Sequence, residues 1–417
     1  MELNARKQDQ KENRVLLLAP QPFYQERGTP MNVRLMCTIL GKAGYKVDLL
    51  VFPTGSSLEI PGVRIFRVPN VFRLKRIAIG FSMIKLMMDA VLIPYAVFLC
   101  LRNRYHVVHG IEEGGVVAVA LGKLFACKSV YDMDSVISAQ FSTHGLAGVF
   151  QRFISLVEKL AIRKASLVLT VCESLSVHAG NLQPGGQIVQ IEDIPLDFAF
   201  PLSEEKKMAS MQTVTTYLKD RQLLDKQLFV YTGNLESYQG IDLMLEAWQQ
   251  ACLKSENMSD ARLVIVGGAE GAVDAYRRKI KEQQGLEGVL FVGQRPAEEM
   301  GAWMQHAYCL LSPRAEGENT PLKIYSYMSS GKPVIATNIV SHTQVLSDAT
   351  AVMVAPEADV MGKAFIQVVQ NADDMAAKGM AARQDVASRF GYEVFSAKLL
   401  AAYAELVKKR SDRNILG

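Results

Sequence analysis

The sequence predicts an α/β fold made of two tandem, doubly wound parallel sheets. The chain has 417 residues, which is long for a single core. Short apolar runs alternate with helical patterns in both halves, as expected for parallel strands joined by crossover helices. The first half opens with the continuous apolar run Arg14–Ala19, and the pattern starts again at Gln227–Thr232. The sequence therefore predicts two Rossmann-like domains of similar size.

The composition is that of an ordinary globular protein, with 49% hydrophobic and 21% charged residues. The net charge of +4 is compatible with anionic small molecules or an acidic membrane. Basic residues are not concentrated in one patch, so we expect no nucleic acid partner. The six cysteines are scattered without metal-ligand spacing. We expect no disulfide framework, no zinc site and a cytoplasmic location.

In the first half, strand Arg14–Ala19 leads into a turn-rich loop, then a helix over Met31–Ala43 and a strand over Lys46–Phe52. The loop lacks GxGxxG, but the loop after a first parallel strand is where doubly wound folds bind ligands. Two further strands end near His109 and Tyr131. We therefore expect the following side chains at the carboxyl edge of the sheet: His109, Glu112, Glu113, Asp132 and Asp134. The alternatives are a structural histidine and solvated loop carboxylates.

Residues Ile77–Leu101 form the most apolar segment of the chain. Lys85 and Asp89 interrupt it and Pro94 is expected to kink it, so a buried or interfacial helix is favoured over a spanning one. Basic residues flank the segment, which makes peripheral contact with an anionic membrane a second expectation. They are Arg73, Lys75, Arg76, Arg102 and Arg104. A core helix with solvated ends is the alternative.

The most informative stretch runs from Arg314 to Thr337. Thr320 is a good N-cap and Pro321 suits the first helical position. Apolar residues then recur at spacing three, Gly331 fits the left-handed position after a helix, and Pro333 prevents its continuation. The free N–H groups at the start of this helix would face the loop that carries Glu318, which favours a phosphate there.

This stretch resembles the donor-binding segment of the family 4 retaining glycosyltransferases. Their motif is a Glu, seven residues, a second Glu on the helix and a Gly-x-Pro-Val turn. Glu318 occupies the first position, Ser326 the second, and Gly331-Lys-Pro-Val the turn. The resemblance implies the GT-B architecture, in which two Rossmann-like domains face a central cleft. Its implied divisions are a disordered tail (1–13), an acceptor domain (14–195), a nucleotide-sugar donor domain (196–391) and a C-terminal helix that crosses back to the first domain (392–417).

The resemblance also implies roles for single residues. Glu318 would bind hydroxyls of the transferred sugar and Lys323 would stabilise the diphosphate, whereas Asp132 and His109 stand near the family's sugar-facing histidine. The other binding residues it implies are Gly28, Thr29, Gly233, Asn234, Gln239, Gly267, Arg295, Arg314, Asn319, Thr320, Leu322 and Ser326. Asn234 and Gln239 stand where the family has Arg and Lys, so Lys323, Arg314 and Arg295 are the candidate replacement cations. The alternatives are a turn glycine at Gly28, a solvent-facing Lys323 and an acidic loop at Glu318.

By this resemblance the protein is a retaining glycosyltransferase of the hexosyltransferase type. The donor would be a UDP- or GDP-linked sugar, no metal would be required, and the acceptor would be a glycan or a lipid-linked glycan in surface polysaccharide or glycolipid biosynthesis. The expected location is cytoplasmic, with peripheral contact at the inner face of the plasma membrane. Two alternatives remain: a catalytically weak GT-B binding or assembly subunit, and a sugar-nucleotide epimerase.

Overall fold

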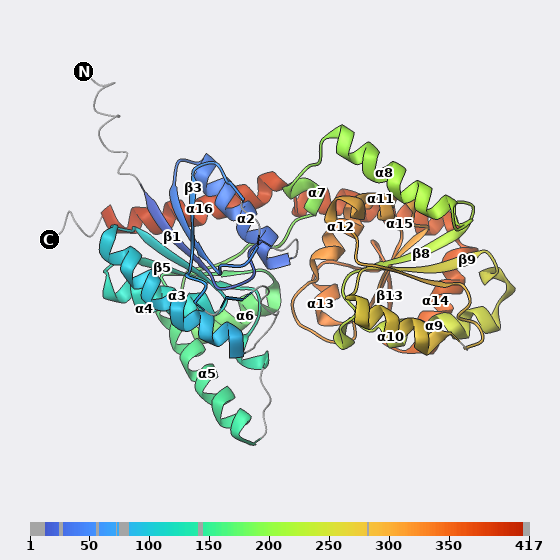
Figure 1. The fold of residues 1–417 in the computed structure, drawn as a ribbon, viewed down its shortest axis with the longest axis horizontal. Coiled ribbons are helices and arrows are strands. Elements are labelled where there is room, and N and C mark those ends of the chain that lie inside the picture. Colours follow the sequence, from blue (N-terminus) through green and yellow to red (C-terminus); the bar gives the residue numbers. More distant parts are fainter. Residues whose placement is uncertain are drawn as a thin grey trace. The chain divides into compact units, whose positions relative to one another are not determined.

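The computed structural model describes residues 13–24, 28–55, 58–71, 73–74, 83–140, 145–281 and 283–411. The chain divides into two compact units (Figure 1). One consists of Met1–Glu192 with Glu393–Gly417, and the other is Asp193–Tyr392. The predicted boundaries followed residues 195 and 391. The first lies earlier because Glu192 is held in the first unit by an ion pair with Lys398 at 2.5 Å.

The described part of the first unit contains a seven-stranded parallel sheet in the order β3-β2-β1-β4-β5-β6-β7. β1 is central, and Leu17 pairs with Leu49 on one side and His109 on the other. The strands are β1 (Arg14–Ala19), β2 (Lys46–Val51), β3 (Val63–Arg67), β4 (Val107–Ile111), β5 (Lys128–Met133), β6 (Leu167–Thr170) and β7 (Ile188–Gln190). Burial on both faces explains why β1 is a continuous apolar run.

Helices cover both faces of this sheet (Figure 1). Right-handed crossovers place four successive helices in one layer, and each contacts the next. These are α3 (Met83–Arg102), α4 (Glu113–Leu124), α5 (Gly145–Lys164) and α6 (Glu173–Leu182). The other face is covered by α2 (Gly28–Lys42) and the C-terminal α16 (Tyr392–Ser411). The tail predicted over residues 1–13 lies almost wholly outside the described residues.

The described part of the second unit contains a six-stranded parallel sheet in the order β10-β9-β8-β11-β12-β13. Its strands are β8 (Gln227–Thr232), β9 (Ala261–Val266), β10 (Val289–Gly293), β11 (Cys309–Ser312), β12 (Val334–Thr337) and β13 (Val352–Val354). β13 lies at an edge of this sheet. Phe229, Trp248 and Phe365 form an edge-to-face cluster in its core, with ring centroids 5.3–5.6 Å apart.

The helices of the second unit are α7 (Leu196–Ala199), α8 (Glu204–Lys219), α9 (Ile241–Lys254), α10 (Glu270–Ile280), α11 (Met300–His306), α12 (Leu322–Ser330), α13 (Val340–Thr343), α14 (Ala358–Gln370) and α15 (Ala372–Arg389). The sequence did not predict α8, because its buried stripe is narrow: only Ser210, Val214 and Leu218 are buried. In the first unit, α2 begins at Gly28 and not at Met31, and α3 continues through Pro94. Residues 77–82 of the predicted apolar segment lie outside the described residues.

Candidate functional site

The carboxyl edge of the second sheet is built from glycine-containing loops that pack closely. Gly233 follows β8 with φ 147°, and Gly267 follows β9 with φ 118°. A Cβ atom on Gly267 would lie 2.0 Å from the carbonyl oxygen of Gly233, and one on Gly233 would lie 2.9 Å from Nζ of Lys323. Both positions therefore need glycine, since it tolerates positive φ and occupies no side-chain space. This packing leaves room for the amine of Lys323 at the end of β8.

Lys323 lies in the first turn of α12 and contacts Tyr231 of β8 and Gln239 of the loop that follows β8. Its Nζ donates to Oε1 of Gln239 at 3.0 Å and lies 3.9 Å from the ring centroid of Tyr231. The Tyr231 hydroxyl donates to the Asn234 carbonyl oxygen at 2.6 Å, which fixes the ring. Gln239 therefore positions a lysine of α12. The alternative of a solvent-facing Lys323 is wrong, because its amine contacts Gln239 and the Tyr231 ring.

Arg314 follows β11 and is buried, with 8% of its surface exposed. Its guanidinium donates to the carbonyl oxygen of Glu316 at 2.6 Å and to Asn319 at the carbonyl oxygen and Oδ1, both at 3.1 Å. It also lies 5.3 Å from the ring centroid of Tyr238. Arg314 therefore fixes the shape of the loop that carries Glu318, and every one of these partners is uncharged.

Two cations thus lie in one partly desolvated region whose hydrogen-bond partners are neutral. Burial, followed by repulsion from Arg314, lowers the pKa of Lys323 well below its usual value. Burial also lowers the pKa of Arg314. Among the described residues, neither cation forms an ion pair with a carboxylate. Since a buried charge is costly unless it is paired, this region is arranged to receive an anion.

The start of α12 adds further hydrogen-bond donors. α12 begins at Leu322, and Pro321 holds the N-cap position without a side-chain hydrogen bond to the helix. The prediction of Thr320 as N-cap and Pro321 as the first helical residue was therefore wrong by one position. The Thr320 hydroxyl is buried and has no hydrogen-bond partner. An uncapped helix N-terminus beside an orphaned hydroxyl and two cations is a suitable cradle for phosphate oxygens.

Glu318 and Ser326 differ in how the structure uses them. Glu318 is exposed, and its carbonyl oxygen accepts a hydrogen bond of 2.7 Å from Nε2 of Gln344, which steadies the loop. Ser326 is buried, and its hydroxyl accepts the backbone N–H of Leu196 at 3.4 Å. Ser326 thus ties α7 to α12. A second tie joins Ser329 to the Asp197 carboxylate at 3.0 Å.

Two of the other predicted binding residues form hydrogen bonds with neighbouring groups of the protein. Arg295 makes a two-bonded ion pair with Glu299, at 2.7 and 2.9 Å, so it is not the replacement cation that we expected. Asn234 lies in the β8 loop, where its Oδ1 accepts the backbone N–H of Glu236 at 3.4 Å. Of the three candidate replacement cations, Arg295 is therefore excluded, and Lys323 and Arg314 remain.

No sequence motif identified His342, which contacts the ends of β11 and β12 next to this site. Its Nε2 lies 2.9 Å from the Ser312 hydroxyl, and its Nδ1 donates to the carbonyl oxygen of Thr337 at 2.8 Å. The Thr337 hydroxyl in turn donates to the carbonyl oxygen of Arg314. Burial, together with repulsion from Arg314 and Lys323, lowers the pKa of His342 to about 4. His342 is therefore a neutral side chain that links β11 to β12 through hydrogen bonds.

In the first unit, His109 and Asp132 form a buried structural link and are not presented to a ligand. His109 lies in the middle of β4, not at its end as predicted, and is 0% exposed. Its Nε2 lies 3.1 Å from Asp132 Oδ2, and its Nδ1 lies 2.6 Å from the hydroxyl of Tyr403 in α16. With Nε2 donating to the carboxylate, Nδ1 accepts from Tyr403. His109 and Asp132, which the sequence placed near the family's sugar-facing histidine, therefore contact each other and the C-terminal helix.

The other candidates of the first unit have ordinary surroundings. Glu112 and Glu113 follow β4 as expected, but Lys85 of α3 lies 3.9 and 2.5 Å from their carboxylates, so they are not solvated loop charges. Gly28 begins α2 without positive φ, and a Cβ atom there would meet nothing within 4 Å. The alternative of a turn glycine is therefore wrong. Thr29 is part of the same first helical turn.

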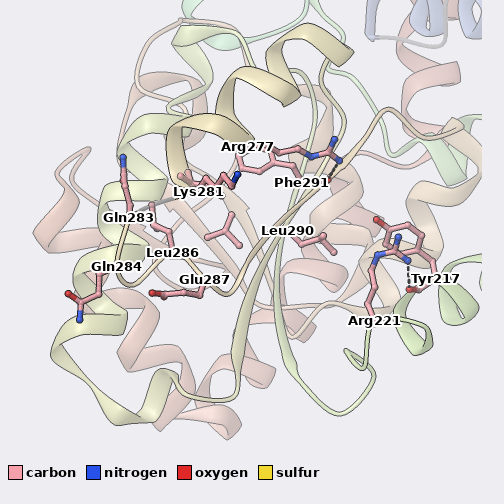
Figure 2. Close-up of a pocket in the computed structure, with 12 residues that line it drawn as sticks. Tyr217, Arg221, Arg277, Lys281, Gln283, Gln284, Leu286, Glu287, Leu290 and Phe291 are labelled. Atoms are coloured by element: carbon pink, nitrogen blue, oxygen red, sulfur yellow. Dashed lines mark hydrogen bonds between the residues drawn. The ribbon is translucent and has the colours of Figure 1, made fainter.

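A pocket of about 650 Å³ lies beside edge strand β10, away from these residues (Figure 2). Its two arginines already have partners in the protein. Arg277 donates to the carbonyl oxygen of Phe291 at 2.7 Å, and Arg221 lies 3.7 Å from the ring centroid of Tyr217. None of the predicted binding residues lines this pocket. We place the functional site at the carboxyl edge because the predicted binding residues gather there, beside two cations and the uncapped start of α12. The described residues contain no group of three or more His, Cys, Asp or Glu side chains that could hold a metal.

Comparison with known proteins gives the same location. Residues 226–371 match the family model described as "Glycosyl transferases group 1", which covers β8, α12 and the whole carboxyl edge described above. The chain is 28% identical over 214 residues to the D-inositol 3-phosphate glycosyltransferase of Xylanimonas cellulosilytica, with 48% of each chain covered. The match therefore spans about half the length of that relative.

Solved structures with the same fold cover nearly the whole chain. The sucrose-phosphate synthase of Thermosynechococcus elongatus is 18% identical, with a TM-score of 0.73 and coverage of 95% of this chain and 100% of that one. HepE of Anabaena in complex with UDP-glucose is 15% identical, with a TM-score of 0.70 and coverage of 94% and 99%. The two-domain fold predicted from the sequence, GT-B, is thereby confirmed.

Proposed function

We propose that the chain, whose residues 226–371 match the group 1 glycosyl transferases, is a retaining glycosyltransferase that uses a nucleotide diphosphate sugar. The observation that carries the proposal is a pair of cations, the buried Arg314 and the half-buried Lys323, whose hydrogen-bond partners among the described residues are all neutral. A diphosphate would supply the missing negative charge. HepE of Anabaena has been solved with UDP and with UDP-glucose, which supports a UDP-linked donor here.

In this proposal the donor diphosphate rests on the N-terminus of α12. The Lys323 amine and the Thr320 hydroxyl bind phosphate oxygens, and the loops at Gly233 and Gly267 allow close backbone approach. Arg314 keeps the Asn319 loop in shape and adds positive charge. Glu318 hydrogen-bonds hydroxyls of the transferred sugar. Because these groups stabilise the charge that develops on the leaving diphosphate, we propose that the reaction requires no bound metal.

Retention would follow from attack on the face from which the diphosphate leaves. An acceptor hydroxyl oxygen bonds to the anomeric carbon as the bond from that carbon to the β-phosphate oxygen breaks. The hydroxyl proton passes to a β-phosphate oxygen, and the nucleoside diphosphate leaves. The acceptor proposed is a glycan or a lipid-linked glycan at the cytoplasmic face of a membrane. Ser326 cannot provide the carboxylate that the family's second Glu provides, so the ribose would be held by neutral hydrogen bonds.

Thermal unfolding with UDP, GDP, ADP and CMP tests the donor site. Saturation at about 100 times the dissociation constant adds roughly 2.7 kcal/mol, a shift of several degrees for a domain of this size. We expect one nucleoside diphosphate to produce this shift, and the diphosphate that does so identifies the base. Four nucleotides without effect would contradict the proposal.

Turnover then separates an enzyme from a binding subunit. We expect Glu318→Gln to bind the free nucleoside diphosphate as tightly as the wild-type protein, but to lose sugar transfer, because its contacts are to the sugar. Wild-type protein that binds the nucleotide but transfers no sugar would indicate the binding or assembly subunit. Conversion of the donor without an acceptor would indicate the epimerase.

A further inference from the structure

Helix α3 carries its ionisable side chains toward the domain and its apolar side chains toward the outside. Lys85 pairs with Glu113 at 2.5 Å, and burial together with repulsion from Glu113 raises the pKa of Asp89 to about 8. The exposed large apolar side chains of the helix are Ile84, Leu86, Met87, Ile93, Phe98 and Leu101. A surface helix in water shows the opposite arrangement, with its charges outside. α3 is therefore adapted to apolar surroundings.

Helix α5, which follows α4 in the same layer, also has an exposed apolar stripe and a buried acidic side chain. An apolar stripe of four residues with spacings of four, three and four is 55–66% exposed: Val149, Phe153, Leu156 and Leu160. The acidic residue Glu158 is buried and accepts the backbone N–H groups of Ile137 and Ser138 at 2.7 and 3.1 Å. The exposed charges of α5 are all basic: Arg152, Lys159, Arg163 and Lys164.

α4 lies between these two helices in the same layer and contacts both (Figure 1). It adds Leu124, which is 69% exposed, and the exposed Lys123. Because all three helices cover one face of the first sheet, their outward sides form one surface. We call it the α3–α5 surface. Within its described residues the exposed charged side chains are Arg102, Lys123, Arg152, Lys159, Arg163 and Lys164, without an exposed carboxylate.

We propose that the α3–α5 surface docks on an anionic lipid bilayer, with α3 and α5 lying in its interface. Apolar stripes flanked by basic residues suit this position, since the stripe enters the acyl boundary while the cations contact anionic headgroups. A second copy of the chain fits less well, because it would bring an equally basic surface against this one. The proposal is independent of the glycosyl transfer reaction.

The structure argues that α3 lies on the membrane and does not cross it. By length and composition the segment Ile84–Arg102 could span a bilayer, with a mean hydropathy of 1.9, and only 28% of it is buried. However, its inner face is part of the domain core, where Met88, Leu92 and Ala96 are at most 1% exposed. Spanning would require that face to leave the core. Docking in the interface keeps the core intact and covers the exposed apolar side chains.

Co-sedimentation of the full chain with lipid vesicles tests the proposal. We expect binding to vesicles of phosphatidylcholine with about a third phosphatidylglycerol, much weaker binding to pure phosphatidylcholine, and weakening at about 1 M salt, where the Debye length is about 3 Å. A triple variant, Arg152→Gln with Lys159→Gln and Arg163→Gln, should lower partitioning on the order of 100-fold. Its matched control replaces three exposed, ion-paired cations of the second unit: Lys206→Gln, Lys207→Gln and Lys254→Gln.

The apolar contribution is tested with Phe153→Ser combined with Leu156→Ser, which should lower partitioning on the order of 10- to 100-fold. The control is Leu253→Ser with Met380→Ser, two residues of the second unit with similar exposure. Nucleotide affinity should stay unchanged in every variant. Absence of binding to anionic vesicles, or equal loss in the controls, would overturn the proposal. The proposal would also be overturned if the wild-type protein bound no vesicles and was a dimer that these variants converted to a monomer, because the surface would then be an interface between two copies of the chain.

A fluorescent reporter avoids any variant that fails to fold. The two tryptophans of the chain, Trp248 and Trp303, are both fully buried in the second unit. Their emission should not respond to vesicles. A tryptophan introduced by Phe153→Trp should shift to shorter wavelength with anionic vesicles as it enters the acyl boundary. Unchanged emission with vesicles present in excess would overturn the proposal.

Discussion

The two domains carry charged side chains at the carboxyl edges of similar parallel sheets, but they satisfy those charges differently. In the first domain, the Glu113 carboxylate after β4 is paired with Lys85, and the Asp132 carboxylate near the end of β5 contacts the His109 ring. In the second domain, Lys323 and Arg314 contact only neutral groups. A charge whose partner is built into the fold stabilises the fold, whereas a charge without one stabilises a bound ligand. The position of a residue at a strand end therefore does not by itself identify a binding residue.

Removing the paired cation should have the largest effect on stability. Lys85→Met leaves Glu113, Glu112 and Asp89 close together without their counter-charge. We expect the free energy of unfolding of the first domain to fall by about 3 kcal/mol, as for a largely buried pair that loses one partner. Denaturant titration of the variant measures this. Lys254→Met, which breaks an exposed pair with Asp359, is the control and should cost at most about 1 kcal/mol. Equal losses of unfolding free energy in Lys85→Met and Lys254→Met would contradict the claim that the Lys85 pair stabilises the first domain.

Acid titration tests whether the second domain resists a further positive charge. His342 has a pKa of about 4 in the folded protein, below the ordinary value of 6.5. The unfolded chain therefore binds the proton first, so this histidine's contribution is complete above pH 6.5 and is lost as the pH falls toward 4. The loss is about 3 kcal/mol. His342→Gln should be less stable at pH 7 but should lose less stability over that range. Parallel pH profiles for the two proteins would show that His342 is not held neutral.

Removing the unpaired cation should affect ligand binding more than the fold. Lys323→Met removes a charge that the protein does not neutralise, so we expect unfolding free energy to rise by about 1 kcal/mol. Loss of a charge-assisted hydrogen bond should weaken nucleoside diphosphate binding by about 1.5–3 kcal/mol, or roughly 10- to 150-fold. Calorimetric titration with the diphosphate measures the affinity. Lys279→Met, whose partner is Asp242, is the control. Unchanged affinity in Lys323→Met would move the site away from α12.

Local sequence patterns were sufficient for the fold and for the centre of the site. Strand and helix periodicities predicted two parallel sheets, because a strand buried on both faces must be apolar throughout. The helix after Glu318 was recognisable from Pro321, Gly331 and Pro333, and its position predicted Lys323 as the cation at its start. These features depend on neighbours within about one helical turn, so the sequence alone contains them. Only the first helical residue was misplaced, since Thr320 does not cap the helix.

The partners of each side chain were decided by tertiary structure. Tyr403 lies 294 residues from His109, and Leu196 lies 130 residues from Ser326. No local sequence pattern predicts contacts between residues so far apart in the chain. Arg295 and Lys323 both looked like unpaired cations near strand ends, but Glu299 neutralises the first, whereas the second contacts the neutral side chains of Gln239 and Tyr231. Whether a charge is available to a ligand depends on long-range packing, which fixes its desolvation and its partners. The sequence by itself determined where charges could gather, and the folded chain decided which of them remain without a counter-ion.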